Sequence, residues 1–351
     1  MCYGGRKMKL LYLSCHSILE YDEIKLFSEL GIEVFSMGYY SNPLKNEDPK
    51  RPPLNILVHP ELEQIHRENQ LSAGKKGLKD AKEDIDQRLI DWADVIYCAH
   101  IVDWLTLNWA KMKGKRIIWR SIGQSTLNVE NLLRPLLPDG LETVRYSPRE
   151  STIPGFAGED AMIRFYKDEK EFGGYTGENN LVITLGQSFK ERENFCNYKI
   201  FDEVTRDYPR KVYGGMNQLL GGLWGGNTDY EQLKKVLRES RVFFYTGTYP
   251  AGYTLSFIEA WMTGIPIVAL GPKLGNSPYE MGQQTYEVPD LIARTGGGFV
   301  SDDIYNLKEM IKFLLRTETL RKNISEKGRA GAIEFFGKDK IKAEWKKYFG
   351  I

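Results

Sequence analysis

The sequence predicts an α/β fold built from two Rossmann-like domains with parallel sheets. Short apolar runs such as Lys9–Ser14 and Asn180–Leu185 alternate with helical patterns in both halves of the chain. The clearest unit, in which a strand, a loop, a helix and a second strand follow one another, occupies residues 241–271. At 351 residues the chain is too long for one comfortable hydrophobic core, and it suits two domains of ordinary size.

The composition of the chain disfavours several classes of protein. A formal net charge of +1 gives no global attraction to nucleic acid or to an anionic membrane. No apolar run approaches the roughly 18 residues that cross a bilayer, and the first residues are too polar for a signal peptide. The cysteines lack paired spacing, which favours a reduced setting, so we expect a cytoplasmic protein. They are Cys2, Cys15, Cys98 and Cys196.

The unit at residues 241–271 predicts a nucleotide site. Val242–Tyr245 and Ile265–Leu270 are expected as buried strands, with a Gly/Pro loop and the helix Leu255–Met262 between them. In a parallel sheet this loop lies at the carboxyl ends of the strands, where the helix amino terminus offers N–H groups to a phosphate. Glu259, one turn into the helix, is placed to accept hydrogen bonds from ribose hydroxyls. The candidate donor-binding residues of this unit are Thr248, Gly252, Tyr253, Thr254, Leu255 and Glu259.

The same stretch resembles the signature of the family 4 retaining glycosyltransferases, which have the GT-B fold. That signature contains a first Glu in Glu-Gly-Phe-Gly, an apolar run, a second Glu in Glu-Ala, and a later Gly-x-Pro. Here Gly252–Thr254, Glu259–Ala260 and Gly264–Pro266 fall in register, whereas Ala251 stands in place of the first Glu. In the family the first carboxylate touches the donor sugar and the second touches the ribose, so the resemblance supports nucleotide binding better than ordinary handling of the sugar.

The resemblance also implies the domain plan of the GT-B fold, in which two Rossmann-like domains face a central cleft. We expect an acceptor domain over residues 1–165, a nucleotide-sugar donor domain over residues 166–335, and a closing helix over residues 336–351 that crosses back to the first domain. Thr143–Ser147 is expected as the last strand of the first domain. Residues 39–69, rich in Pro, Asn and charge, are expected as a long functional or mobile loop.

Candidate residues in the first half follow predicted strands. The loop with His16 and Ser17 lacks glycine, which favours side-chain contacts over close backbone approach. His100 ends a predicted strand, where a histidine is either structural or functional, and in the family a histidine of this region often contacts the donor sugar. Arg120 is expected to meet an anionic group or to pair with a nearby carboxylate. The catalytic candidates are His100, Asp103 and Arg120, and the loop contacts are His16, Ser17 and Gln124.

The second half has a basic segment after its first predicted strand. Family 4 enzymes place Gly-Arg-x-x-x-x-Lys there, and its two cations hold the donor diphosphate. The Arg is absent from its usual place, but Lys190 and Arg192 supply comparable charges, unless they only form the solvated start of a helix. The resemblance also implies that the nucleobase rests near Gly215. The candidate donor-binding residues of this half are Gly186, Gln187, Ser188, Lys190, Arg192 and Gly215.

The first functional hypothesis is a hexosyltransferase-like enzyme that moves a sugar from a nucleoside-diphosphate donor, such as a UDP-sugar, to a glycan, lipid, metabolite or modified nucleic acid. Cations and helix N–H groups stabilise a departing diphosphate without a metal. No Asp-x-Asp pair appears where a metal-dependent transferase would need one, and no His/Cys cluster has ligand spacing, so neither metal nor cofactor is expected. Resemblance implies retention of configuration. The alternatives are a nucleotide-sugar binding protein without transfer activity, which Ala251 motivates, and an epimerase of the same fold. A dinucleotide oxidoreductase is disfavoured because no Gly-x-Gly-x-x-Gly follows an early strand.

Overall fold

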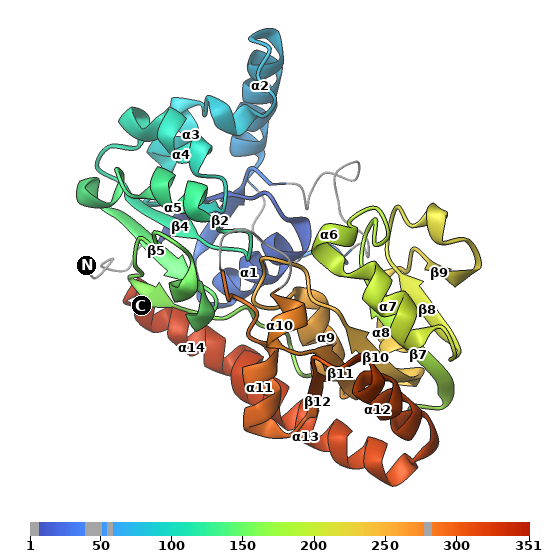
Figure 1. Ribbon diagram of the computed structural model, residues 1–351. Coiled ribbons are helices and arrows are strands. Elements are labelled where there is room, and N and C mark those ends of the chain that lie inside the picture. Colours follow the sequence, from blue (N-terminus) through green and yellow to red (C-terminus); the bar gives the residue numbers. More distant parts are fainter. Residues whose placement is uncertain (1–6, 39–50, 55–58, 277–282) are drawn as a thin grey trace.

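The computed structural model contains two parallel sheets of six strands, each surrounded by helices (Figure 1). The structure describes residues 7–38, 51–54, 59–276 and 283–351. The strands of the first sheet are β1 (Lys9–Leu13), β2 (Glu33–Ser36), β3 (Val95–Ala99), β4 (Arg116–Arg120), β5 (Leu141–Arg145) and β6 (Ala161–Met162). The strands of the second sheet are β7 (Asn179–Leu185), β8 (Arg210–Tyr213), β9 (Trp224–Gly226), β10 (Ser240–Tyr245), β11 (Ile267–Leu270) and β12 (Gly298–Ser301). The expected fold class is therefore confirmed.

The strand order defines where ligands bind in such sheets. The first sheet has the order β2-β1-β3-β4-β5-β6, and the second has the order β12-β11-β10-β7-β8-β9. The direction of winding therefore reverses between β1 and β3 and again between β7 and β10. At such a switch point the loops that leave the carboxyl ends of the two strands diverge, which opens the usual ligand position of open α/β sheets.

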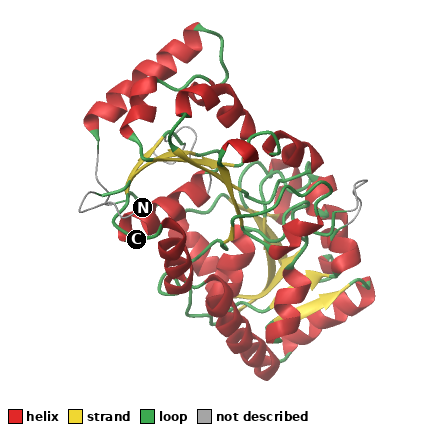
Figure 2. Cartoon of the chain, turned by 90° about the vertical axis from the view of Figure 1, so that its left-hand side faces the viewer, coloured by secondary structure: helices red, strands yellow, loops and turns green. Residues whose placement is uncertain are grey.

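Helices cover the faces of both sheets (Figure 2). Those of the first half are α1 (Ser17–Glu29), α2 (Pro60–Lys75), α3 (Gln87–Trp92), α4 (Val102–Asn108) and α5 (Leu127–Leu133). Those of the second half are α6 (Glu193–Cys196), α7 (Tyr198–Thr205), α8 (Tyr230–Glu239), α9 (Leu255–Thr263), α10 (Pro272–Gly275), α11 (Val288–Thr295), α12 (Ile304–Arg316), α13 (Glu318–Phe336) and α14 (Lys338–Phe349). Short 3₁₀ turns are η1 (Ala81–Glu83), η2 (Trp109–Met112), η3 (Leu137–Asp139), η4 (Pro148–Thr152) and η5 (Gln218–Leu223). Within the described ranges no helix combines the length and apolar character of a membrane span.

Two sequence predictions about the first half were wrong. The last strand of its sheet is β6, which pairs with β5 and lies beyond the predicted final strand 143–147. With only two residues, β6 carries too short an apolar pattern to be recognised. The predicted loop 39–69 ends in helix α2, which starts with Pro60 at its first position and has acidic residues in its first turn, as helix starts favour. Residues 39–50 and 55–58 of that prediction lie outside the described residues.

The closing helix α14 packs on the first half of the chain (Figure 1). Trp345 lies 5.1 Å from the ring of Phe27 in α1 and is buried with Phe349 in the same apolar cluster. Between α13 and α14 the helical path is broken at Gly337, where a Cβ would lie 2.5 Å from the carbonyl oxygen of Ile333.

The chain passes between the two halves at two places that lie side by side. The connection after β6 forms a parallel bridge with the α13–α14 break, through Lys167 and Gly337. The backbone N–H of Lys167 donates to the carbonyl of Phe336 at 3.0 Å. The predicted domain boundaries near residues 165 and 335 stay predictions, but both fall close to this bridge.

Candidate functional site

Unusual backbone conformations gather at the carboxyl ends of the strands. Among the described residues, four that are not glycine have positive φ, namely His100 (66°), Ser188 (45°), Asn197 (56°) and Met216 (55°). His100 follows β3, Ser188 follows β7 and Met216 follows β8. Such conformations cost free energy and cluster at functional sites. His100 and Ser188 lie in the loops at the two switch points, and these loops are therefore candidate functional sites.

The loop after β7 is held against the loop after β8. The side-chain amide of Asn217 donates to the carbonyls of Gly186 at 2.6 Å and Gly214 at 3.0 Å, and the N–H of Ser188 donates to the carbonyl of Gly215 at 3.1 Å. A Cβ at Gly214 would lie 2.5 Å from the carbonyl oxygen of Gly186, so only glycine permits this approach. The structure thus brings together Gly186, Ser188 and Gly215, three of the predicted donor-binding residues, and half-buried Gln187 lies between the first two.

Among the described residues, neither of the two predicted phosphate-binding cations has an acidic partner. Lys190 is exposed, and its ammonium lies 5.8 Å from the centre of the Tyr198 ring. The Arg192 guanidinium lies 5.9 Å from the centre of the Phe195 ring. In the described part of the chain neither side chain forms an ion pair. Both positive charges therefore remain able to bind an anion.

The loop after β10 lies against α6, across the switch point from the β7 loop. The Thr246 hydroxyl donates to the carbonyl of Cys196 at 2.6 Å, and the Asn197 amide donates back to the carbonyl of Thr246 at 3.0 Å. The backbone carbonyl of the predicted site residue Thr248 accepts from the N–H of Ala251 at 2.8 Å. The predicted residues that follow β7 and β10 therefore share one region of the second half.

Helix α9 starts in this region. The Thr254 hydroxyl is its N-cap and accepts from the N–H of Phe257 at 3.3 Å. The N–H groups that begin at Leu255 have no intrahelical partner, because they belong to the first helical turn. These N–H groups and the helix dipole are the features on which the predicted phosphate contact depends, and that contact stays a prediction.

Two further predicted donor residues, Gly252 and Tyr253, contact Tyr146 at the end of β5. The N–H of Gly252 donates to the Tyr146 hydroxyl at 2.5 Å, and the Tyr253 hydroxyl donates to the Tyr146 carbonyl at 2.7 Å. The Tyr253 ring is buried against Phe165 and Phe336. A phosphate could use the Gly252 amide only after the Tyr146 hydroxyl has moved away.

Glu259, which is predicted to accept hydrogen bonds from ribose hydroxyls, lies in the packed interior. Its side chain is only 4% exposed, lies 2.6 Å from the Lys167 ammonium, and also pairs with Arg51. Burial raises the pKa of the Glu259 carboxyl, but Lys167 and Arg51 lower it more strongly, so the net pKa lies below the usual range. Two cations from distant parts of the chain thus keep an ionised carboxylate in the interior. Its contact with ribose stays a prediction.

At the first sheet, His100 has the features of a functional histidine. Its backbone is fixed by bonds from its N–H to the Arg120 carbonyl at 2.9 Å and from the Trp119 indole to its own carbonyl at 2.8 Å. Its Nδ1 is buried and has no hydrogen-bond partner among the residues described. Burial lowers the pKa of His100 to about 4, so the ring is neutral near pH 7 and offers one donor and one acceptor.

The loop after β1 lies next to the end of β3. His16 is the N-cap of α1, and its Nδ1 accepts from the N–H of Leu19 at 3.4 Å. The thiol of Cys15 donates to the carbonyl of Ala99 at 3.3 Å, which links the loop of His16 to the residue before His100. The first switch point therefore brings the loops of both predicted histidines together.

The remaining candidates of the first half differ in exposure. Asp103 and Gln124 are exposed, and Ser17 is buried in the first turn of α1. Arg120 is buried, with bonds to the Glu23 carboxylate at 3.3 Å and the Arg145 carbonyl at 2.9 Å. This position favours the structural alternative for Arg120, pairing with a carboxylate, over a catalytic role.

The sequence did not single out two residues that shape the contact between the halves. Tyr146 meets the β10 loop, as described above, and Glu150 supports it by accepting from the N–H of Tyr146 at 2.9 Å and the hydroxyl of Ser121 at 2.8 Å. Burial raises the pKa of Glu150 to about 7, and within the described ranges its Oε1 has no partner. The available signal was their position beyond a buried strand: Tyr146 follows β5 directly, and Glu150 lies in the next 3₁₀ turn, η4.

Ala251 packs closely against the first half. A Cβ at Gly123, in the loop after β4, would lie 2.9 Å from the Cβ of Ala251 and 2.9 Å from the Tyr146 hydroxyl. The space in which a longer side chain at position 251 would extend is thus partly filled by the Gly123 backbone.

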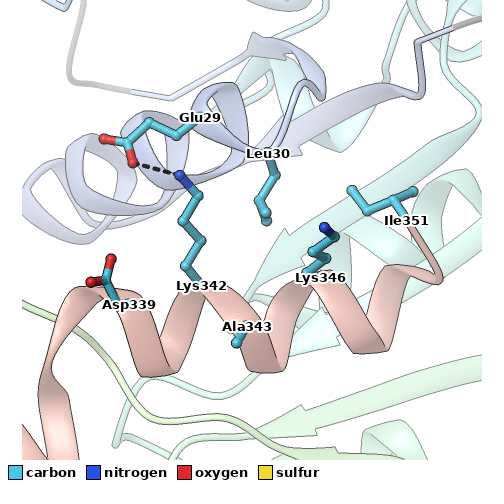
Figure 3. Close-up of a pocket in the computed structure, with 7 residues that line it drawn as sticks. All are labelled: Glu29, Leu30, Asp339, Lys342, Ala343, Lys346 and Ile351. Carbon is cyan, nitrogen blue, oxygen red and sulfur yellow. Dashed lines mark hydrogen bonds and ion pairs between the residues drawn. The ribbon is translucent and has the colours of Figure 1, made fainter.

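A cavity of about 450 Å³ lies away from these loops, between α1 and α14 (Figure 3). In it Lys342 pairs with Glu29 at 3.0 Å. Its walls are formed by Glu29, Leu30, Asp339, Lys342, Ala343, Lys346 and Ile351, none of which is a predicted site residue.

Among the described residues no group of three or more His, Cys, Asp or Glu side chains is arranged to hold a metal ion.

Comparison with known proteins identifies the fold class. The sequence matches no known protein-family profile and no curated protein. The structure is similar to that of Anabaena HepE (Alr3699) in complex with UDP-glucose, at a TM-score of 0.68 and 13% identity over 98% of this chain and 99% of the other. These two chains therefore share the GT-B architecture of glycosyltransferases.

Two other solved structures have the same architecture. A glycosyltransferase from Rickettsia africae is similar at a TM-score of 0.64 and 10% identity, over 98% of both chains. An alpha-glucosyltransferase in complex with UDP-glucose and DNA containing an abasic site is similar at a TM-score of 0.60 and 11% identity, over 99% of this chain and 100% of the other. At these identities the likeness shows the fold.

Proposed function

We propose that the protein is a glycosyltransferase that uses a nucleoside-diphosphate sugar. The observation that carries this proposal lies at the β7/β10 switch point, where the segment after β7 contacts the loop that leads into the start of α9. That segment bears Lys190 and Arg192, which form no ion pair among the described residues. A diphosphate that leaves the anomeric carbon carries negative charge, and cations and helix N–H groups stabilise that charge. UDP is the proposed nucleotide, because structures of similar fold contain UDP or UDP-glucose.

In the proposed reaction, the sugar passes from the diphosphate to the hydroxyl group of the acceptor in one step. The acceptor hydroxyl forms a bond to the anomeric carbon, the bond to the diphosphate breaks, and the hydroxyl proton is released. His100 orients the donor sugar, and Glu259 binds the ribose. We propose that the reaction retains configuration, needs no metal and takes place in the cytoplasm. The acceptor is a glycan, lipid, metabolite or modified nucleic acid.

The phosphate role of the two cations can be tested by calorimetry. Replacing both Lys190 and Arg192 with Met should weaken UDP binding at least about 100-fold, because two charge-assisted contacts are lost, each of about 1.5–3 kcal/mol. Lys199→Met is the matched control, since Lys199 is exposed on α7 near this loop. Equal UDP affinity of the wild type and the double variant would contradict this role, and a wild type that binds no nucleoside diphosphate would refute the proposed function.

The ribose role of Glu259 can be tested with Glu259→Gln, which keeps the shape of the side chain. UDP affinity should fall by about 1–3 kcal/mol, because a neutral amide is a weaker acceptor than a carboxylate. The melting temperature should fall too, because Lys167 and Arg51 lose their shared anion. Titration calorimetry on the folded variant separates the two effects, and unchanged affinity would argue against ribose binding.

A second candidate function is nucleotide-sugar binding without transfer, which Ala251 favours because the carboxylate that meets the donor sugar in family 4 is missing. The two functions differ in turnover. Release of UDP from a UDP-sugar with a panel of acceptors would support the transferase, whereas tight binding with no turnover would support the binding protein. Recovery of an altered sugar still attached to UDP would instead indicate an epimerase.

A further inference from the structure

Lys167 lies at the centre of a buried group of charges that joins the two halves of the chain. Its ammonium is 2.8 Å from Asp22 on α1 and 2.6 Å from Glu259 on α9. Arg51 also pairs with Glu259, and its guanidinium lies 4.4 Å from the centre of the Tyr230 ring. Two cations and two carboxylates therefore balance one another in the interior. Lys167 bonds one carboxylate on each half.

The backbone holds Lys167 in place. Its N–H donates to the carbonyl of Phe336, and it forms the bridge with Gly337 where the two chain connections run side by side. The side chain is 2% exposed, so it has little freedom to turn away. The position of its ammonium is therefore set by the connection itself, and it fixes the carboxylates that it contacts.

We propose that Lys167 is a positioning residue for donor binding. It holds the Glu259 carboxylate, which is buried in this structure, and the ribose hydroxyls of the nucleotide donate to that carboxylate in the place that the Arg51 guanidinium occupies here. This inference rests on the proposed function and on the predicted ribose contact. A lysine ammonium has three donors, and two of them suffice for Asp22 and Glu259. Through the same ammonium, the ribose-binding carboxylate is tied to α1, whose N-cap is His16 at the other switch point.

Charge balance decides which variants are informative. Lys167→Met alone leaves two buried carboxylates with one cation, which is strongly destabilising. The double variant Asp22→Asn/Lys167→Met leaves Glu259 with Arg51, so the buried charges balance again. Lys170→Met is the matched control, because Lys170 lies on the same connection and is exposed.

The test compares the affinities of UDP and 2′-deoxy-UDP by titration calorimetry. The wild type and Lys170→Met should bind 2′-deoxy-UDP about tenfold more weakly than UDP, because a hydrogen bond to a charged acceptor is lost. The balanced double variant should fold, bind UDP about tenfold more weakly than the wild type, and lose most of the preference for UDP over the deoxy analogue. A merely structural lysine would lower the melting temperature and leave that preference unchanged.

The outcomes separate this inference from the proposed function. If the folded double variant keeps the wild-type preference for UDP, Lys167 does not position Glu259, and the inference is overturned while nucleotide binding stands. A wild type that binds both nucleotides equally overturns the ribose contact together with the inference. If the wild type binds neither nucleotide, the proposed function itself fails.

Discussion

Acid should destabilise the protein through His100, and the size of the effect follows from its environment. Burial lowers the pKa of this imidazole from 6.5 to about 4. Because the pKa in the folded state is depressed, the neutral ring contributes stability that is complete above about pH 6.5 and is lost as the pH falls through 4. At about 1.4 kcal/mol for each pKa unit, the total is roughly 3 kcal/mol.

The perturbation is His100→Asn. Asparagine tolerates positive φ, so the variant keeps the backbone at 66° while it removes the titrating ring. Urea denaturation at about pH 7 and about pH 4 gives the free energy of unfolding of each protein. Relative to the variant, the wild type should lose roughly 3 kcal/mol between these two conditions. If His100 orients the donor sugar, the variant should also lose more turnover than UDP affinity.

The free energy of unfolding of the wild type must be compared with that of His100→Asn at each pH. Glu150 titrates in the same pH range, and its contribution to stability changes with pH in the opposite direction. Wild-type stability alone could therefore change little with pH even if both pKa shifts are present. The free energies of unfolding of the wild type and His100→Asn could differ by the same amount at both pH values. That result would refute the prediction, because the ring would then have the same pKa in the folded and unfolded states.

Three more predictions concern Glu150, Gly123 and Trp345. Burial raises the pKa of Glu150 from 4.5 to about 7, so its contribution to stability is complete below pH 4.5 and is lost as the pH rises through 7. Glu150→Gln should therefore gain stability relative to the wild type on going from acid to mildly basic pH, measured by denaturation at several pH values. Gly123→Ala should cost at least about 1 kcal/mol, because φ is 93° and the new Cβ would meet Ala251; a melting temperature equal to that of the wild type would contradict this contact. Trp345→Ala should cost about 3–5 kcal/mol by urea denaturation, because a buried indole is removed from between α14 and α1, and a loss below about 1 kcal/mol would show that α14 is loosely attached.

The sequence was sufficient to predict the two sheets and most of their strands. Arg116–Arg120 has the predicted bounds, and the helix at Leu255 starts at the predicted residue. These elements were predictable because an apolar run between turn residues identifies a buried strand, and because a Thr before an apolar helix identifies its start. The same local signals predicted which loops follow the strands.

The partners of buried polar groups could not be predicted. The Tyr146 hydroxyl meets the Gly252 amide, and the partners of Glu259 are Arg51 and Lys167, all from distant positions in the sequence. Nothing in the local pattern of residues specifies such pairs, because they depend on how the two halves pack. For this reason the burial of Glu259 was not predicted, although its place on α9 was.

The break at Gly337 has a mechanical consequence. Helix α13 packs on α9, whereas α14 packs on α1, so the last two helices pack on different lobes, the two halves of the structure. At the bridge between Lys167 and Gly337, the two chain connections between the halves run side by side along one short line. Rotation of one lobe against the other would be concentrated in the few backbone torsions beside this line, which makes it the natural hinge, and Trp345 would travel with the first lobe.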